Sequence, residues 1–130
     1  MVFGNRVQRP EEEHMQKQVR HCVVWNEQQA CYEIQVIRPI IFGWLGFEPD
    51  TGQWFAWLER IPSFRFQGRR GHFTARKETR KRGSVYWIAY RHVKGKLRKQ
   101  YIGVPATVTI TRLEELAGEL GRLTVPQADA

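Results

Sequence analysis

The sequence predicts an α+β fold: a three- to four-stranded antiparallel β-meander with a C-terminal amphipathic helix packed on one face, preceded by an N-terminal β-hairpin and a short helix. Two observations predict it. Short β-favouring runs alternate with turn residues between residues 64 and 104. A segment with one apolar stripe at helical spacing follows, and such a helix needs a sheet face to cover.

The chain of 130 residues has the length of one domain. We divide it into a flexible acidic arm at residues 1–20, a single domain at residues 21–120 and a tail at residues 121–130. Within the domain, residues 64–120 hold the basic sheet and the helix. Three consecutive glutamates, residues 11–13, make the arm acidic.

The N-terminal hairpin is predicted from two β-favouring runs, residues 22–25 and 31–37, which flank the polar stretch 26–29. Arg38-Pro39 ends the second run, because proline cannot donate to a β-ladder. Residues 49–52 have the composition of a turn.

The short helix is predicted at residues 53–60, where Trp54, Trp57 and Leu58 share one helical face. Pro62 ends it. The meander then follows, with strands predicted at residues 64–67, 72–79, 85–93 and 97–104.

The C-terminal helix is predicted to begin at Thr109 or Thr111, and Thr111 with Glu114 fits a capping box. Its apolar stripe runs from Ile110 to Leu120, and Gly121 is the expected stop. The three glutamates of this helix are expected to face water: Glu114, Glu115 and Glu119.

Alternation along residues 85–93 gives that strand two different faces. One carries Val85, Trp87, Ala89, Arg91 and Val93, and the other carries Tyr86, Ile88, Tyr90 and His92. We expect the Arg91 side to be open and the Tyr86, Ile88 and Tyr90 side to pack on the helix.

Positive charge is concentrated in the meander. Residues 65–101 hold 13 Lys or Arg and one acid, Glu78, a net of +12, whereas the whole chain carries +8 and the remainder therefore −4. Clustered cations of this kind favour a polyanionic partner.

The predicted function is therefore non-enzymatic nucleic-acid binding, with duplex DNA preferred and RNA possible. Cations in hairpin turns at opposite ends of a sheet can contact the phosphates of both strands of a duplex. Aromatic residues interleaved with these cations can also stack on the bases of a single strand. The expected phosphate contacts are Arg69, Arg70, Lys81, Arg82, Lys94, Lys96 and Lys99. The expected base contacts are Arg76, Arg91 and Arg98.

The motif GSVYWIAYRHVKGKLRKQYIG at residues 83–103 extends this interpretation. With WFAWL at 54–58, FTARKE at 73–78 and TITRLE at 109–114, it resembles a module near the N-terminus of bacterial LuxR-type, ATP-binding transcriptional regulators and of related small stand-alone proteins. The resemblance covers Trp54 to Leu120. Residues 82–103 and the helix after them also resemble arm-type DNA-binding domains of tyrosine integrases. These resemblances imply transcription regulation or a mobile element.

No catalytic residue, metal site or cofactor is predicted. Tyr86 and the later Tyr101-Ile102-Gly103 resemble a GIY-YIG nuclease signature, but the downstream glutamate that would hold its metal is missing. His21, Cys22 and Cys31 do not have the spacing of a zinc site.

Protein–protein interaction through residues 21–50 is the alternative function, with Trp25, Trp44 and Phe47 as the anchors. The first 20 residues contain no apolar run typical of a secretory signal, and no apolar stretch reaches the length of a membrane span. The expected compartment is the cytoplasm, and no membrane partner is expected.

Overall fold

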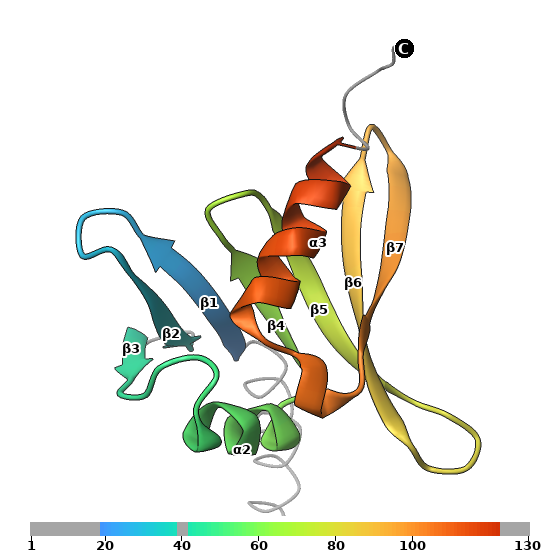
Figure 1. The fold of residues 1–130 in the computed structure, drawn as a ribbon, viewed down its shortest axis with the longest axis horizontal. Helices are drawn as coiled ribbons and strands as arrows, with labels where there is room; N and C mark the ends of the chain where they lie inside the picture. Colours follow the sequence, from blue (N-terminus) through green and yellow to red (C-terminus); the bar gives the residue numbers. More distant parts are fainter. Residues whose placement is uncertain (1–18, 39–41, 123–130) are drawn as a thin grey trace, which may run out of the picture.

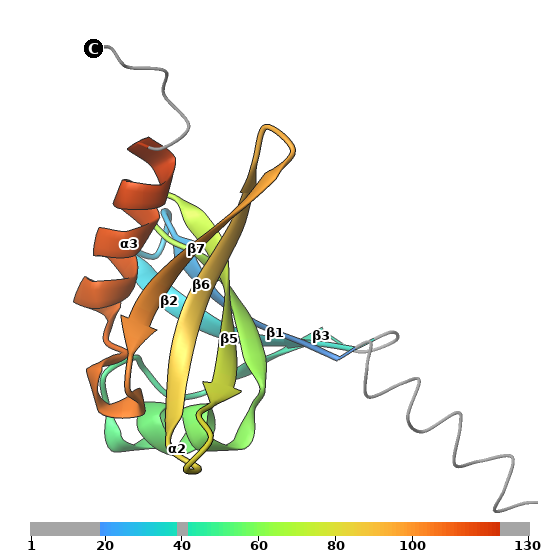
Figure 2. The same cartoon turned by 90° about the vertical axis from the view of Figure 1, so that its right-hand side faces the viewer.

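A computed structural model describes residues 19–38 and 42–122, so residues 1–18 of the predicted arm (1–20) and residues 123–130 of the predicted tail (121–130) lie outside the described residues. The described chain forms a seven-stranded sheet in the order β3-β2-β1-β4-β5-β6-β7, with two helices, α2 and α3. Figures 1 and 2 show both helices on the same side of this sheet. The broad α+β class is confirmed.

The predicted hairpin is confirmed: β1 (Arg20–Asn26) and β2 (Cys31–Ile37) pair antiparallel through the whole of both strands. The Asn26 side chain closes the turn between them by accepting a hydrogen bond from the Gln29 N–H at 3.0 Å. A further strand that the sequence reasoning did not predict, β3 (Phe42–Leu45), pairs with β2 and forms one edge of the sheet.

The predicted short helix is α2 (Gly52–Arg60). Thr51 caps it by accepting a hydrogen bond from the Trp54 N–H. Its buried side carries Trp54, Trp57 and Leu58, as the spacing predicted. The Trp54 indole donates to the Val108 carbonyl oxygen at 2.8 Å, which joins α2 to the segment before α3.

The predicted meander is present as four antiparallel strands: β4 (Ser63–Gln67), β5 (His72–Thr79), β6 (Val85–Val93) and β7 (Lys96–Gly103). The expectation of a sheet with only three or four strands was wrong. β1 pairs parallel with β4, and this pairing joins the hairpin and the meander into one sheet. Val23 of β1 lies beside Phe66 of β4, and both are fully buried.

After the short 3-10 turn η1 (Pro105–Thr107), the chain enters α3 (Ile110–Arg122). Thr109 caps this helix, since its hydroxyl accepts from the Arg112 N–H at 3.3 Å. The predicted capping box with Thr111 and a solvent-facing Glu114 was wrong. Glu114 is only 8% exposed, because it bonds to Tyr32 of β2 and to the β4–β5 turn rather than to its own helix start.

The assignment of the two faces of β6 was also wrong. Trp87 and Ala89 are fully buried in the core with the helices, so the Arg91 side is the covered one. Ala89 pairs with Ala75, and these two small side chains leave room for the helix layer. Tyr86 and Tyr90 instead lie on the open face, where both hydroxyls bond to Glu78.

Neither helix in these two described ranges has the length and hydrophobicity that crossing a membrane requires.

Candidate nucleic-acid interface

The open face of the sheet is organised in rows of paired residues that cross four strands. One row runs Arg65, Thr74, Tyr90, Lys99, and the next runs Ser63, Arg76, Ile88, Tyr101. Successive residues of a strand point to opposite sides, so members of one row share a face. The opposite side of the same strands carries Phe64, Phe66 and Trp87, which are buried.

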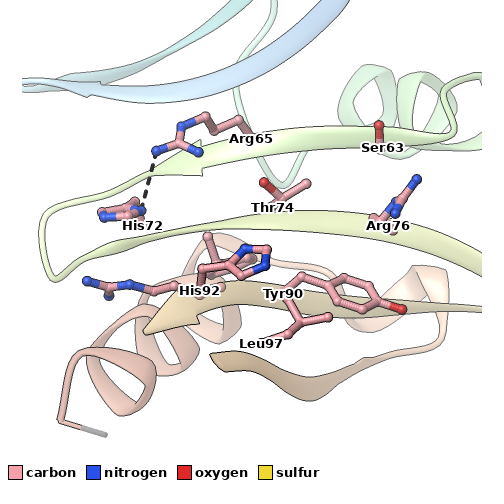
Figure 3. Close-up of a pocket in the computed structure, with 10 residues that line it drawn as sticks. Ser63, Arg65, His72, Thr74, Arg76, Tyr90, His92 and Leu97 are labelled. Atoms are coloured by element: carbon pink, nitrogen blue, oxygen red, sulfur yellow. Dashed lines mark hydrogen bonds between the residues drawn. The ribbon is translucent and has the colours of Figure 1, made fainter. Parts of the chain in front are cut away.

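These rows border a cavity of about 530 Å³, a volume within the range of ligand sites. The residues that line it come from β4, β5, β6 and β7: Ser63, Arg65, His72, Phe73, Thr74, Arg76, Tyr90, Arg91, His92 and Leu97. Figure 3 shows eight of these side chains labelled. Among the described residues, three arginines and two histidines but no carboxylate line the cavity, so it favours an anion.

Arg65 and His72 interact directly in this cavity. Arg65 Nη2 lies 3.4 Å from His72 Nδ1, the contact marked by the dashed line in Figure 3. Burial, and then the neighbouring Arg91 and Arg65 cations, lower the pKa of His72 from its ordinary value.

A second group on the open face is built around Glu78, which accepts hydrogen bonds from the Tyr86 hydroxyl at 3.1 Å and from the Tyr90 hydroxyl. These bonds lower the pKa of Glu78 and raise the pKa of both tyrosines, because they favour the carboxylate and the protonated phenols. The two rings are thereby held on the sheet surface.

Cations lie over the tyrosine rings of this face. The Arg80 guanidinium is 4.4 Å from the centre of the Tyr86 ring, and Lys99 Nζ is 5.6 Å from the centre of the Tyr90 ring. The Arg76 guanidinium is 5.9 Å from the Tyr90 ring centre. With rings and cations alternating in this way, bases can stack on the rings while the cations contact the neighbouring phosphates.

Six of the ten predicted contact residues lie on the open face or at its two ends. Arg76 and Lys99 are on the face itself. Lys81 and Arg82 are exposed in the β5–β6 turn, whereas Lys94 and Lys96 are exposed where β6 meets β7. Because the meander is antiparallel, these two turns lie at opposite ends of the sheet (Figure 1).

The side chains of the other four predicted residues do not share this face, although Arg91 borders the cavity. Arg69 lies 4.8 Å from the centre of the Trp25 ring, and Arg70 lies against α3 at Gly118. Arg91 of β6 and Arg98 of β7 are paired with each other. They lie on the same side of the sheet as Ala89 and Gln100, and Gln100 donates to Glu119 of α3. Their contact roles stay predictions.

Sequence reasoning missed Arg65 and Thr74 as members of the site. The sequence did contain a signal for Arg65, because it lies between Phe64 and Phe66. Two large apolar residues on one side of a strand place the residue between them on the other side. Thr74 gives no such signal, because only its pairing with Tyr90 places it in the cavity.

No group of three or more His, Cys, Asp or Glu side chains within residues 19–38 and 42–122 is arranged to hold a metal ion.

Among the predicted anchors of a protein interface, Trp44 is 63% exposed. Trp25 and Phe47 are partly covered, because they pack on Tyr32 and Trp57.

Comparison with known proteins gives no family assignment: no family model matches the chain, and neither does any curated protein or solved structure. The proposals below therefore rest on the sequence and on the geometry of the open face.

Proposed function

We propose that this protein is a non-enzymatic nucleic-acid-binding module that binds duplex DNA through the open face of its sheet. The observation that carries the proposal is the pair of rows on that face, which combine Arg65, Arg76 and Lys99 with Tyr90 and Tyr101. We propose a cytoplasmic setting, and the sequence resemblances favour a role in bacterial transcription regulation or in a mobile element.

The length of β6 supports a duplex as the preferred target. Its nine residues, at about 3.3 Å each, separate the two basic turns by about 30 Å. The same groove of a duplex returns about every 34 Å. Lys81 and Arg82 at one end and Lys94 and Lys96 at the other thus match phosphates about one helical turn apart, while the sheet between them faces the groove.

The test is fluorescence anisotropy with labelled random duplex DNA, single-stranded DNA and RNA, each across a salt series. We expect affinity to fall steeply with salt for all three and the duplex to bind most tightly. Tighter binding to a single strand than to the duplex would mean that the protein binds single-stranded nucleic acid, with its bases stacked on the tyrosines. No binding to any of the three at low salt would overturn the proposal.

Charge-matched variants locate the interface. Lys81→Ala with Arg82→Ala, and Lys94→Ala with Lys96→Ala, should each reduce the salt slope by about two ions. The control is Arg60→Ala with Arg122→Ala, two exposed arginines at the ends of α2 and α3. An equal reduction in the control would mean that net charge alone, and not the open face, determines binding.

Exposure of Trp44 favours a second candidate, a protein-interaction module. Trp44 lies on β3, one of the two edge strands of the described sheet, and its indole donates to Glu33. Aromatic side chains of this size dominate many interfaces. Trp44→Ala should abolish binding to a protein partner but leave the affinity for duplex DNA within about twofold, which separates the two functions.

A further inference from the structure

The contact between Arg65 and His72 fixes the protonation state of the histidine. A guanidinium has only N–H donors, so His72 Nδ1 must accept the hydrogen bond from Arg65 Nη2 and carries no proton in this arrangement. The proton of the neutral ring is then on Nε2. His72 is therefore uncharged while it remains bonded to Arg65.

Within the part of the chain that the structure describes, the cavity lining around this pair contains positive charge without a carboxylate. On β6, Arg91 and His92 line the same cavity, and Arg91 is one of the cations that act on His72. On β5 the next acid is Glu78, six residues along the strand and about 20 Å away, where it is bonded to tyrosines. An anion is the group that this corner of the cavity lacks.

We propose that Arg65 and His72 form a phosphate subsite of the open face, with one backbone phosphate of the bound nucleic acid seated between the guanidinium and the imidazole. The inference rests on the proposed function, since it assigns the phosphate to a nucleic-acid backbone. Thr74, which pairs with Arg65, adds a hydroxyl donor, and Tyr90 in the same row offers a ring to the neighbouring base.

Binding at this subsite is coupled to proton uptake. When the phosphate displaces the Arg65–His72 hydrogen bond, Nδ1 takes a proton from solvent and donates to a phosphate oxygen, while Arg65 donates to another. The single negative charge of the backbone phosphate stabilises the protonated imidazole against the burial and the repulsion that now keep His72 neutral. The affinity for nucleic acid should therefore rise as the pH falls through the range in which His72 titrates.

Two glutamine variants test the coupling in the full chain. His72→Gln keeps a neutral oxygen that can accept from Arg65 but cannot take up a proton. His92→Gln removes the other histidine of the cavity and leaves the Arg65 contact in place, so it measures separately what His92 contributes to the pH dependence. The readouts are the dissociation constant of a labelled duplex at constant ionic strength and the NMR signals of the His72 ring.

Between about pH 7.5 and about pH 5.5 the wild type should gain about three- to tenfold in affinity; His92→Gln should keep most of this gain, whereas His72→Gln should stay within about twofold. The duplex should shift the His72 ring signals, and inorganic phosphate at the same concentration should shift them far less. A gain in His72→Gln equal to that of the wild type would overturn the subsite.

The same data separate the subsite from the proposed function. If duplex DNA binds but the His72 signals do not move, the subsite is wrong and nucleic-acid binding stands. If no nucleic acid binds while inorganic phosphate moves these signals, the backbone assignment and the proposed function both fail, and the cavity is a site for free phosphate.

Discussion

The Tyr32 hydroxyl of β2 donates a hydrogen bond of 2.5 Å to the Glu114 carboxylate of α3, across 82 residues of sequence. The same carboxylate accepts from the backbone N–H groups of Arg69 and Arg70, at 2.7 and 3.0 Å. One buried side chain thus joins the N-terminal hairpin, the β4–β5 turn and the helix. It also raises the pKa of Tyr32, after the larger effect of burial.

Replacing Glu114 by Gln should lower the free energy of unfolding by about 2–4 kcal/mol. The carboxylate accepts from three donors, the Tyr32 hydroxyl and the N–H groups of Arg69 and Arg70. The glutamine amide has only one accepting oxygen, and its NH2 group cannot accept, so at least one buried donor is left unpaired. Urea denaturation measures the change. Glu115→Gln is the control: its partner Arg112 lies at 3.4 Å on the surface, so it should change stability by less than about 0.5 kcal/mol. Equal losses in both variants would contradict the role given to Glu114.

Gly71→Ala should destabilise the fold by about 1–3 kcal/mol. Gly71 has a φ of +156°, and a Cβ at this position would lie 2.6 Å from the backbone carbonyl oxygen of Ala117 in α3. Thermal unfolding followed by circular dichroism measures the loss. In the matched variant Gly46→Ala the added methyl meets nothing within 4 Å, and the melting temperature should stay close to that of the wild type.

Glu78→Gln should lower the pKa of Tyr90 and Tyr86 toward the ordinary value of about 10. Their hydrogen bonds to the carboxylate are the largest cause of the raised pKa of each phenol, and a neutral amide holds the phenolic proton less strongly. Ultraviolet absorbance of the phenolates across an alkaline titration follows the change. Glu33→Gln is the control: it removes a carboxylate from β2 of the same sheet and should leave the pKa of both tyrosines unchanged.

Stability should decrease on acidification from neutral pH. Burial is the main cause of the lowered pKa of both His21 and His72. Below the unfolded pKa of about 6.5 the unfolded chain binds protons that the folded chain resists, so the stability present above that pH is lost as the pH falls.

His21→Phe identifies the contribution of His21, whose ring lies edge-on to Trp57 and whose Nδ1 is buried without a partner in the described structure. Denaturation at several pH values should give a shallower pH dependence for this variant than for the wild type. A pH dependence as steep as that of the wild type would show that His21 does not contribute.

Local sequence determined where most secondary structure lies. The predicted strands at 72–79 and 85–93 agree with β5 and β6 residue for residue, because alternating apolar residues and turn residues such as Gly83 are signals within a few positions. The Trp54 and Trp57 spacing likewise predicted α2. Such signals need no partner from elsewhere in the chain.

Only the tertiary structure decided which surfaces those elements cover. A period of two gives Trp87 and Tyr86 opposite faces but does not say which one meets the helices. The helix layer packs over Ala75 and Ala89, and the tyrosine hydroxyls find Glu78 on the other side, so the faces are the reverse of the prediction. The parallel pairing of Val23 with Phe66 and the burial of Glu114 also depend on partners more than 40 residues away. Periodicity carries no information about contacts at that distance, whereas the free energy of packing depends on them.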